Sequence, residues 1–134
     1  MIIFNLINLN SFFSILPFLD LAHIHNYGIS FGLFANVLNK WFILFISITV
    51  TFIIIYLFYK TKNNFEKWGL LLILAGAISN IFDRALNNYV LDFIYLHYKD
   101  YYWPAFNFAD IYITFGVLMF LFILLKDIVK SNRK

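Results

Sequence analysis

The chain contains no cysteine and few charged residues for its length of 134 residues. Without cysteine it has no disulfide, no thiol nucleophile and no cysteine-ligated zinc. Only 13% of its residues are charged, whereas a soluble domain carries about 25%. Because 63% of the residues are hydrophobic and the mean hydropathy is +0.80, too few polar side chains are present to cover a globule in water. The composition therefore predicts a single domain embedded in lipid.

Histidine is also scarce, and the only close pair is His23 and His25. Two histidines at this spacing are typical of alternate positions on a strand, so we expect no metal site. We also expect no organic cofactor. The basic residues flank apolar segments and form no surface stripe, which disfavours a nucleic-acid partner. The lysine-rich ends are expected to contact the anionic heads of membrane phospholipids.

Three apolar segments, about 41–59, 68–86 and 109–129, are long enough to cross a bilayer. About 20 helical residues cross the hydrocarbon layer, which is roughly 30 Å thick. Three continuous spans cannot close a barrel, so these segments are predicted to be helices.

Shorter elements are expected between and before the spans. Alternation over Asp20 to Tyr27 and over Val90 to Tyr95 predicts strands, and Asn26-Tyr27-Gly28 predicts a turn. The predicted fold class is an α-helical integral membrane protein, a bundle of transmembrane helices with a small extracytoplasmic β-sheet and loop unit.

The basic residues indicate the orientation of the spans. Most of them lie between the first and second spans or at the end of the third: Lys60, Lys62, Lys67, Lys126, Lys130, Arg133 and Lys134. Since basic loops stay in the cytoplasm, the C-terminus is predicted to be cytoplasmic, and residues 1–40 and the loop 87–108 to be extracytoplasmic. Ile2 to Phe18 is a poor span, so this orientation also predicts a short translocated tail or an upstream helix absent from this sequence.

Asp92 and Asp110 bracket the polar loop between the second and third spans. A carboxylate at the membrane boundary is costly, so it indicates a functional site. Two carboxyl groups held close together do not both ionise readily, and a protonated and an ionised aspartate together can activate a water molecule. Taken alone, Asp110 has an alternative interpretation as a residue that only stabilises the N-terminus of the third helix, with Asn107 as the helix cap. We expect the pair to belong to a membrane-embedded hydrolase.

The end of the second span carries Asn80, Asp83 and Arg84, which share one helix face at i, i+3 and i+4 spacing. This face should point into the bundle. For Asp83 the favoured interpretation is an ion pair that supports Arg84. For Arg84 a structural role and the binding of a substrate carbonyl or lipid headgroup remain equal alternatives.

Three stretches resemble lipoprotein signal peptidase (signal peptidase II), a bacterial membrane aspartyl protease. They are Asn26-Tyr27-Gly28-Ile29-Ser30-Phe31, then Asn80 to Arg84 leading to Val90-Leu91-Asp92-Phe93, and finally Phe106-Asn107-Phe108-Ala109-Asp110. The family usually has four spans, and the Asp-Gln-x-x-Lys-type stretch of its first span is absent here. Ala75 and Ser79 stand where the family commonly has glycine, which predicts slightly looser helix packing.

The resemblance implies a function and assigns roles to residues. Asp92 and Asp110 would be catalytic; Asn26, Gly28, Asn80, Arg84 and Asn107 would shape the substrate pocket, with Asp83 as structural support. The implied reaction removes the signal peptide from diacylglyceryl-modified prolipoproteins, just before the lipidated cysteine, at the outer face of the bacterial inner membrane. It requires no metal, and the enzyme would act as a monomer.

Two other classes of function compete with this interpretation. One is a small transporter or channel subunit in which Asp83, Arg84 and Asp92 line a polar path; the absence of a polar site in the first span disfavours it. The other is a catalytically inactive membrane scaffold, if the upstream helix is truly lost.

Overall fold

The computed structural model describes residues 7–29, 32–35 and 37–132. Ser30 and Phe31 of the first motif, and Arg133 and Lys134 of the basic C-terminus, lie outside these ranges. The chain forms two compact units, which we call the sheet unit and the helical unit. The sheet unit contains Met1–Leu44 and Phe82–Asn107, and the helical unit contains Phe45–Ile81 and Phe108–Lys134.

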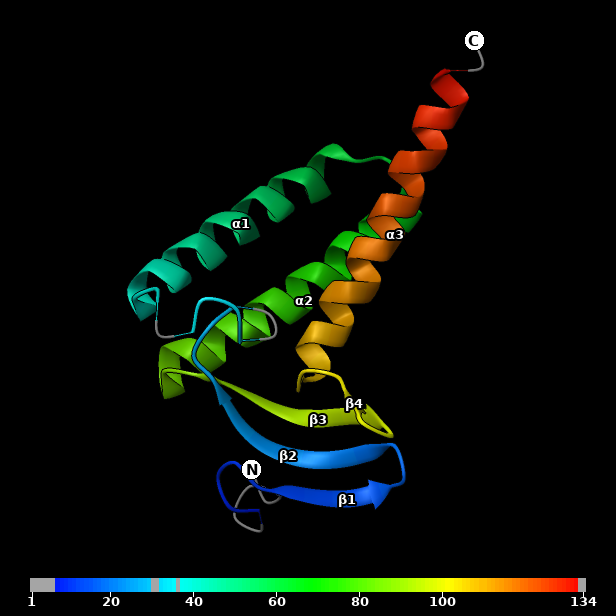
Figure 1. Cartoon of the computed structure of the whole chain (residues 1–134). Helices are drawn as coiled ribbons and strands as arrows, with labels where there is room; N and C mark the ends of the chain where they lie inside the picture. The colour runs from blue at the N-terminus through cyan, green and yellow to red at the C-terminus, as the bar shows by residue number, and fades with distance from the viewer. Residues whose placement is uncertain (1–6, 30–31, 36, 133–134) are drawn as a thin grey trace. The chain divides into compact units, whose positions relative to one another are not determined.

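The sheet unit contains an antiparallel sheet in the order β1-β2-β3-β4 (Figure 1). Its strands are β1 (Phe12–Leu16), β2 (Leu19–Asn26), β3 (Val90–Tyr98) and β4 (Tyr101–Tyr102). The predicted strands at Asp20 to Tyr27 and Val90 to Tyr95 are confirmed, and the second is longer than expected. The segment 87–108, predicted to be a loop, contains β3 and β4.

Strand β1 was not predicted from the sequence. It lies at the edge of the sheet, and all its residues are exposed. A half-buried strand alternates between apolar and polar residues, but Phe-Phe-Ser-Ile-Leu is apolar on both faces and lacks that signal. The interpretation of Ile2 to Phe18 as a broken apolar run therefore missed an edge strand.

A register shift between Leu21 and Ile24 sets the pairing of β2 with β3. One extra residue on β2 places Ile24 opposite Asp92 and Asn26 opposite Val90. Because side chains alternate along a strand, Asn26 lies on the same face of β2 as Ile24, diagonally across from Asp92. The bulge thus determines which side chains of β2 reach Asp92.

The predicted spans are helices: α1 (Lys40–Lys60), α2 (Asn64–Asn87) and α3 (Phe108–Ser131). By length and composition all three are able to cross a membrane. Asparagines cap two of them, because Asn39 Oδ1 accepts from Trp41 N at 2.9 Å and Asn63 Oδ1 from Phe65 N at 2.9 Å. Helix α2 ends where Asn88 adopts a left-handed conformation with φ of 69°.

Within the helical unit, glycines bring α2 and α3 into backbone contact. A Cβ added to Gly76 would lie 2.3 Å from the carbonyl oxygen of Ala109, and one added to Gly116 would lie 2.4 Å from that of Gly69. Small residues that allow such close approach are typical of helix packing in membranes. Ala75 and Ser79 are exposed and lie outside this contact, and the expectation of looser packing there stays a prediction.

Candidate active site

Asp92 lies on β3 and is the most buried polar residue among those described, with 2% of its surface exposed. A buried carboxylate requires hydrogen-bond donors, because it loses the water that would otherwise solvate it. Two asparagines supply them. Asn26 donates through Nδ2 to Oδ2 of Asp92 at 2.9 Å, and Asn107 donates through Nδ2 to Oδ1 at 2.9 Å.

The segment that precedes α3 pairs with β3, and this pairing brings Asn107 to Asp92. Phe106 pairs with Ile94 in an isolated bridge, with hydrogen bonds of 3.0 Å from Phe106 N to Ile94 O and 2.9 Å in the reverse direction. Asn107 follows directly and is buried. Asn26 and Asn107 hold one carboxylate oxygen each, so the orientation of Asp92 is fixed by two separate segments.

The turn after β2 is built on Asn26 and Gly28. Oδ1 of Asn26 accepts from the backbone N–H of Gly28 at 2.9 Å, which confirms the predicted turn, while Nδ2 also donates to the carbonyl of Ile29 at 3.2 Å. A Cβ on residue 28 would lie 2.3 Å from the carbonyl oxygen of Leu33. Glycine is therefore required by the close approach of the following backbone.

Arg84 anchors this turn from the end of α2. Its Nη2 donates to the carbonyl oxygen of Gly28 at 2.6 Å, and the side chain is buried. A charged donor makes this bond stronger than one between neutral groups. The structure thus shows Arg84 holding the turn that contains Asn26 and Gly28, and its predicted binding of a substrate carbonyl or lipid headgroup stays a prediction. Asp83 is half-buried, and its predicted support of Arg84 stays a prediction.

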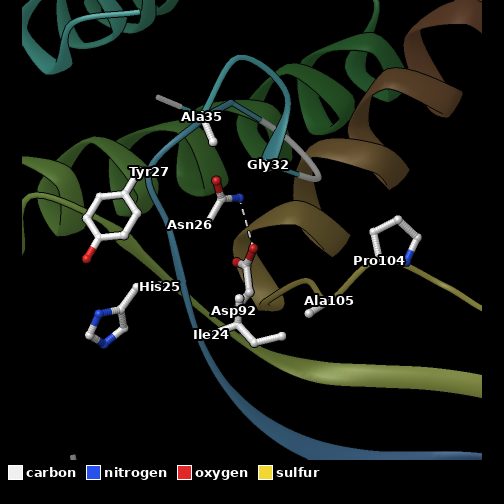
Figure 2. A pocket seen from close by; sticks show the side chains of 9 residues that line it. All are labelled: Ile24, His25, Asn26, Tyr27, Gly32, Ala35, Asp92, Pro104 and Ala105. Carbon is white, nitrogen blue, oxygen red and sulfur yellow. Dashed lines mark hydrogen bonds between the residues drawn. The ribbon is translucent and has the colours of Figure 1, made fainter. Parts of the chain in front are cut away.

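A cavity of about 150 Å³ opens beside Asp92 (Figure 2). Figure 2 shows the Asn26 and Asp92 side chains facing each other, with the ring of His25 on the far side of Asn26 from Pro104 and Ala105. The cavity is lined by Ile24, His25, Asn26, Tyr27, Gly32, Ala35, Asp92, Pro104 and Ala105. A mostly apolar opening with one oriented carboxylate is the usual form of a small binding site.

His25 at this cavity was not predicted as a site residue. Burial, and to a lesser extent the nearby His23, lower the pKa of the His25 imidazole below its ordinary value of 6.5. Its ring is therefore mostly neutral at pH 7. Alternation along β2 places His25 on the face opposite Asn26, so the sequence gave no signal that His25 borders the cavity.

The helical unit holds the second predicted aspartate. Asp110 is in the first turn of α3, and its Oδ1 accepts from Nδ2 of Asn80 on α2 at 3.1 Å. Asn80 is buried and Asp110 half-buried. The prediction that Asp110 opens the third helix is confirmed, and there the positive end of the helix dipole faces its carboxylate. The convergence of Asp92 and Asp110 stays a prediction.

Replacing Arg84 with methionine is expected to loosen the turn after β2. Methionine approximates the length of the side chain but donates nothing, so the carbonyl of Gly28 loses a charged hydrogen bond valued at about 1.5–3 kcal/mol. Limited proteolysis in detergent should show faster cleavage near Gly28, while a matched change at the exposed Lys99 to methionine should not. Equal cleavage rates for the Arg84 variant and the wild type would contradict the anchoring role.

The chain is similar to known proteins along most of its length. The family model described as signal peptidase (SPase) II matches residues 1–126. A lipoprotein signal peptidase of Thermodesulfovibrio yellowstonii is 42% identical over 81% of this chain and 71% of its own length. Those of Serratia marcescens and Clostridium tetani are 38% and 37% identical, and the matches cover 64% and 76% of their lengths. A solved bacterial membrane enzyme, 33% identical, superposes with a TM-score of 0.83 over 95% of this chain and 77% of its own.

Proposed function

Since the chain belongs to the signal peptidase II family, we propose that it removes signal peptides from lipidated precursors with Asp92 and Asp110 as its catalytic pair. The family and its relatives establish a lipoprotein signal peptidase function. The aspartic mechanism, the lipid on the substrate and the roles of individual residues are our proposal.

The observation that carries the mechanism is the environment of Asp92. Its carboxylate is buried, oriented by Asn26 and Asn107, and lines the cavity of about 150 Å³. An apolar side chain could fill this position without the cost of burying a charge, so a carboxylate held there by two amide donors supports a chemical role. Preorganised groups of this kind act where charge changes during a reaction.

The sequence of the chain supports a role for Asp110 beside Asp92. Asn107, which donates to Asp92, is followed directly by α3, in which Asp110 is the third residue. Asn80, which donates to Asp110, precedes Arg84 by about one helical turn on α2. Asn107, which holds Asp92, is thus close in sequence to Asp110, and Asn80, which holds Asp110, is close in sequence to Arg84, which anchors the turn containing Asn26.

The proposed reaction follows from one ionised and one protonated aspartate. The ionised carboxylate takes a proton from a water molecule, whose oxygen attacks the scissile carbonyl. The protonated partner donates its proton to the developing oxyanion. As the tetrahedral diol collapses, the C–N bond breaks, the first aspartate gives its proton to the leaving amine, and the second takes a proton back from a diol hydroxyl, which restores one ionised and one protonated aspartate.

The membrane location of the proposed site suits a substrate that carries a lipid anchor. A diacylglyceryl group stays in the hydrocarbon while the peptide bond before the lipidated cysteine sits at headgroup level. We place this site at the extracytoplasmic face of the bacterial inner membrane, with the C-terminus in the cytoplasm, and propose that the enzyme acts as a monomer surrounded by phospholipid.

The test is cleavage of a signal-bearing precursor by the purified full-length chain in lipid. We expect cleavage immediately before the diacylglyceryl-modified cysteine, and at least about tenfold slower cleavage of the same precursor without lipid, because remote binding energy is lost. EDTA should leave the rate unchanged. Cleavage at another bond, or equal rates for the two precursors, would contradict the proposed substrate.

A further inference from the structure

His23 and His25 bring two ring nitrogens together on one face of β2. Their Nε2 atoms are 3.2 Å apart, and their ring centres are 5.1 Å apart with the planes inclined at 62°. Both side chains are half-buried, so solvent reaches them. The cleavage chemistry proposed above uses neither ring.

Each ring is held by a partner other than its neighbour. Nδ1 of His23 lies 2.8 Å from the carbonyl oxygen of Ile7, and because a carbonyl only accepts, Nδ1 carries the proton and Nε2 keeps its lone pair. His25 stacks on Tyr89 with ring centres 3.5 Å apart and planes within 12°. A carbonyl that accepts from the second ring nitrogen is the usual orienting partner of a metal-binding histidine.

The spacing of the pair matches two imidazoles bound to one ion. With Zn–N bonds of about 2.0–2.1 Å at the tetrahedral angle, two ligand nitrogens are roughly 3.3–3.4 Å apart. The ring centres of two imidazoles directed at that ion are then roughly 5.2 Å apart. The observed 3.2 Å and 5.1 Å agree with both values.

We propose that His23 and His25 bind one divalent transition-metal ion of the Zn²⁺ type through their Nε2 atoms. Among the described residues no group of three His, Cys, Asp or Glu side chains gathers, so water completes the coordination. In the metal-free pair Nε2 of His25 donates to Nε2 of His23. When the ion binds, that proton moves to Nδ1 of His25, both rings stay neutral and no proton is released.

The site is distinct from the cleavage chemistry but adjoins its cavity. His25 lines the cavity together with Asp92, and it directly precedes Asn26, which orients Asp92. An ion bound at the pair would fix the His25 ring at the edge of the cavity. The inference does not depend on the proposed function, because ion binding is measured without substrate.

The test is a titration of the purified full-length chain with ZnCl₂, followed by calorimetry, after removal of any histidine tag. We expect saturable binding of one Zn²⁺ per chain. His23→Ala and His25→Phe should each weaken it by about 10–100-fold or more, because each removes one of two protein ligands. His25→Phe keeps a ring to stack on Tyr89, so a loss of binding without a change in circular dichroism reports the missing nitrogen.

His97→Ala is the matched control. His97 lies at the other end of β3 beside Asp20, 3.4 Å from its carboxylate, and its removal should leave Zn²⁺ affinity unchanged. Mg²⁺ should not compete, because imidazole nitrogen favours Zn²⁺ over cations that prefer oxygen ligands. No saturable binding, equal affinity in His25→Phe, or displacement by Mg²⁺ at similar concentration would each overturn the proposal.

Discussion

Replacing Asp92 with asparagine is expected to reduce precursor cleavage by about a thousandfold or more, because asparagine cannot exchange the proton that general acid–base catalysis requires. Asparagine has nearly the same shape, and its oxygen can still accept from one of the two amide donors, Asn26 or Asn107. Its NH₂ group meets the other donor, a mismatch that costs about 1–3 kcal/mol. The unfolding temperature should therefore fall by several degrees, with the protein still folded at the assay temperature, while activity is lost.

Asp110→Asn should lose activity to a similar extent, and the double variant should be no worse than either single one. Residues that act as a unit in one step are strongly non-additive. Asp100→Asn provides the control, because it makes the same substitution on an exposed residue between the two aspartates in the sequence. A single variant that keeps more than about a tenth of the wild-type rate is incompatible with a shared role in proton transfer.

Gly76→Ala is expected to reduce both stability and activity sharply. The added Cβ would lie 2.3 Å from the carbonyl oxygen of Ala109 and 2.7 Å from Cγ1 of Ile113. Because the first of these is a backbone atom, no side-chain rotation removes the clash, and α3 must move. Overpacking of this kind costs about 1–3 kcal/mol or more.

Activity should suffer more than stability does. Ala109 directly precedes Asp110, so a displaced carbonyl also displaces the carboxylate, and a shift of about 1 Å at a reacting group costs about a hundredfold in rate. The control is Ala75→Leu, which adds more atoms at an exposed position of the same helix. Wild-type cleavage and unfolding temperature for Gly76→Ala would show that α3 does not rest on Gly76.

The helices were predictable because their signal is independent of context. Any apolar stretch as long as α1, α2 or α3 must satisfy its backbone internally in lipid. Strands β2 and β3 were found by alternation, which requires one face to differ from the other. Strand β1, exposed on both faces, has no such difference, and β4 is too short to produce a pattern.

The candidate site was predictable in its residue types but not in its contacts. Asp92, Asn26 and Asn107 were named from motif resemblance and from the cost of placing a carboxylate near lipid. That the two asparagines hold opposite oxygens of Asp92 follows from a bulge in β2 and from the bridge between Ile94 and Phe106. Both depend on register between segments distant in sequence, which composition and periodicity do not reveal.

The edge strand β1 has a practical consequence for handling this protein. Phe12, Phe13, Ile15 and Leu16 are exposed on β1, which lies at the edge of the sheet formed by the described strands. A short, uncharged, aromatic ribbon of this kind is a template for cross-β association between chains. A soluble fragment made from the sheet alone is therefore expected to aggregate. Purification of the full chain requires detergent from cell lysis onward.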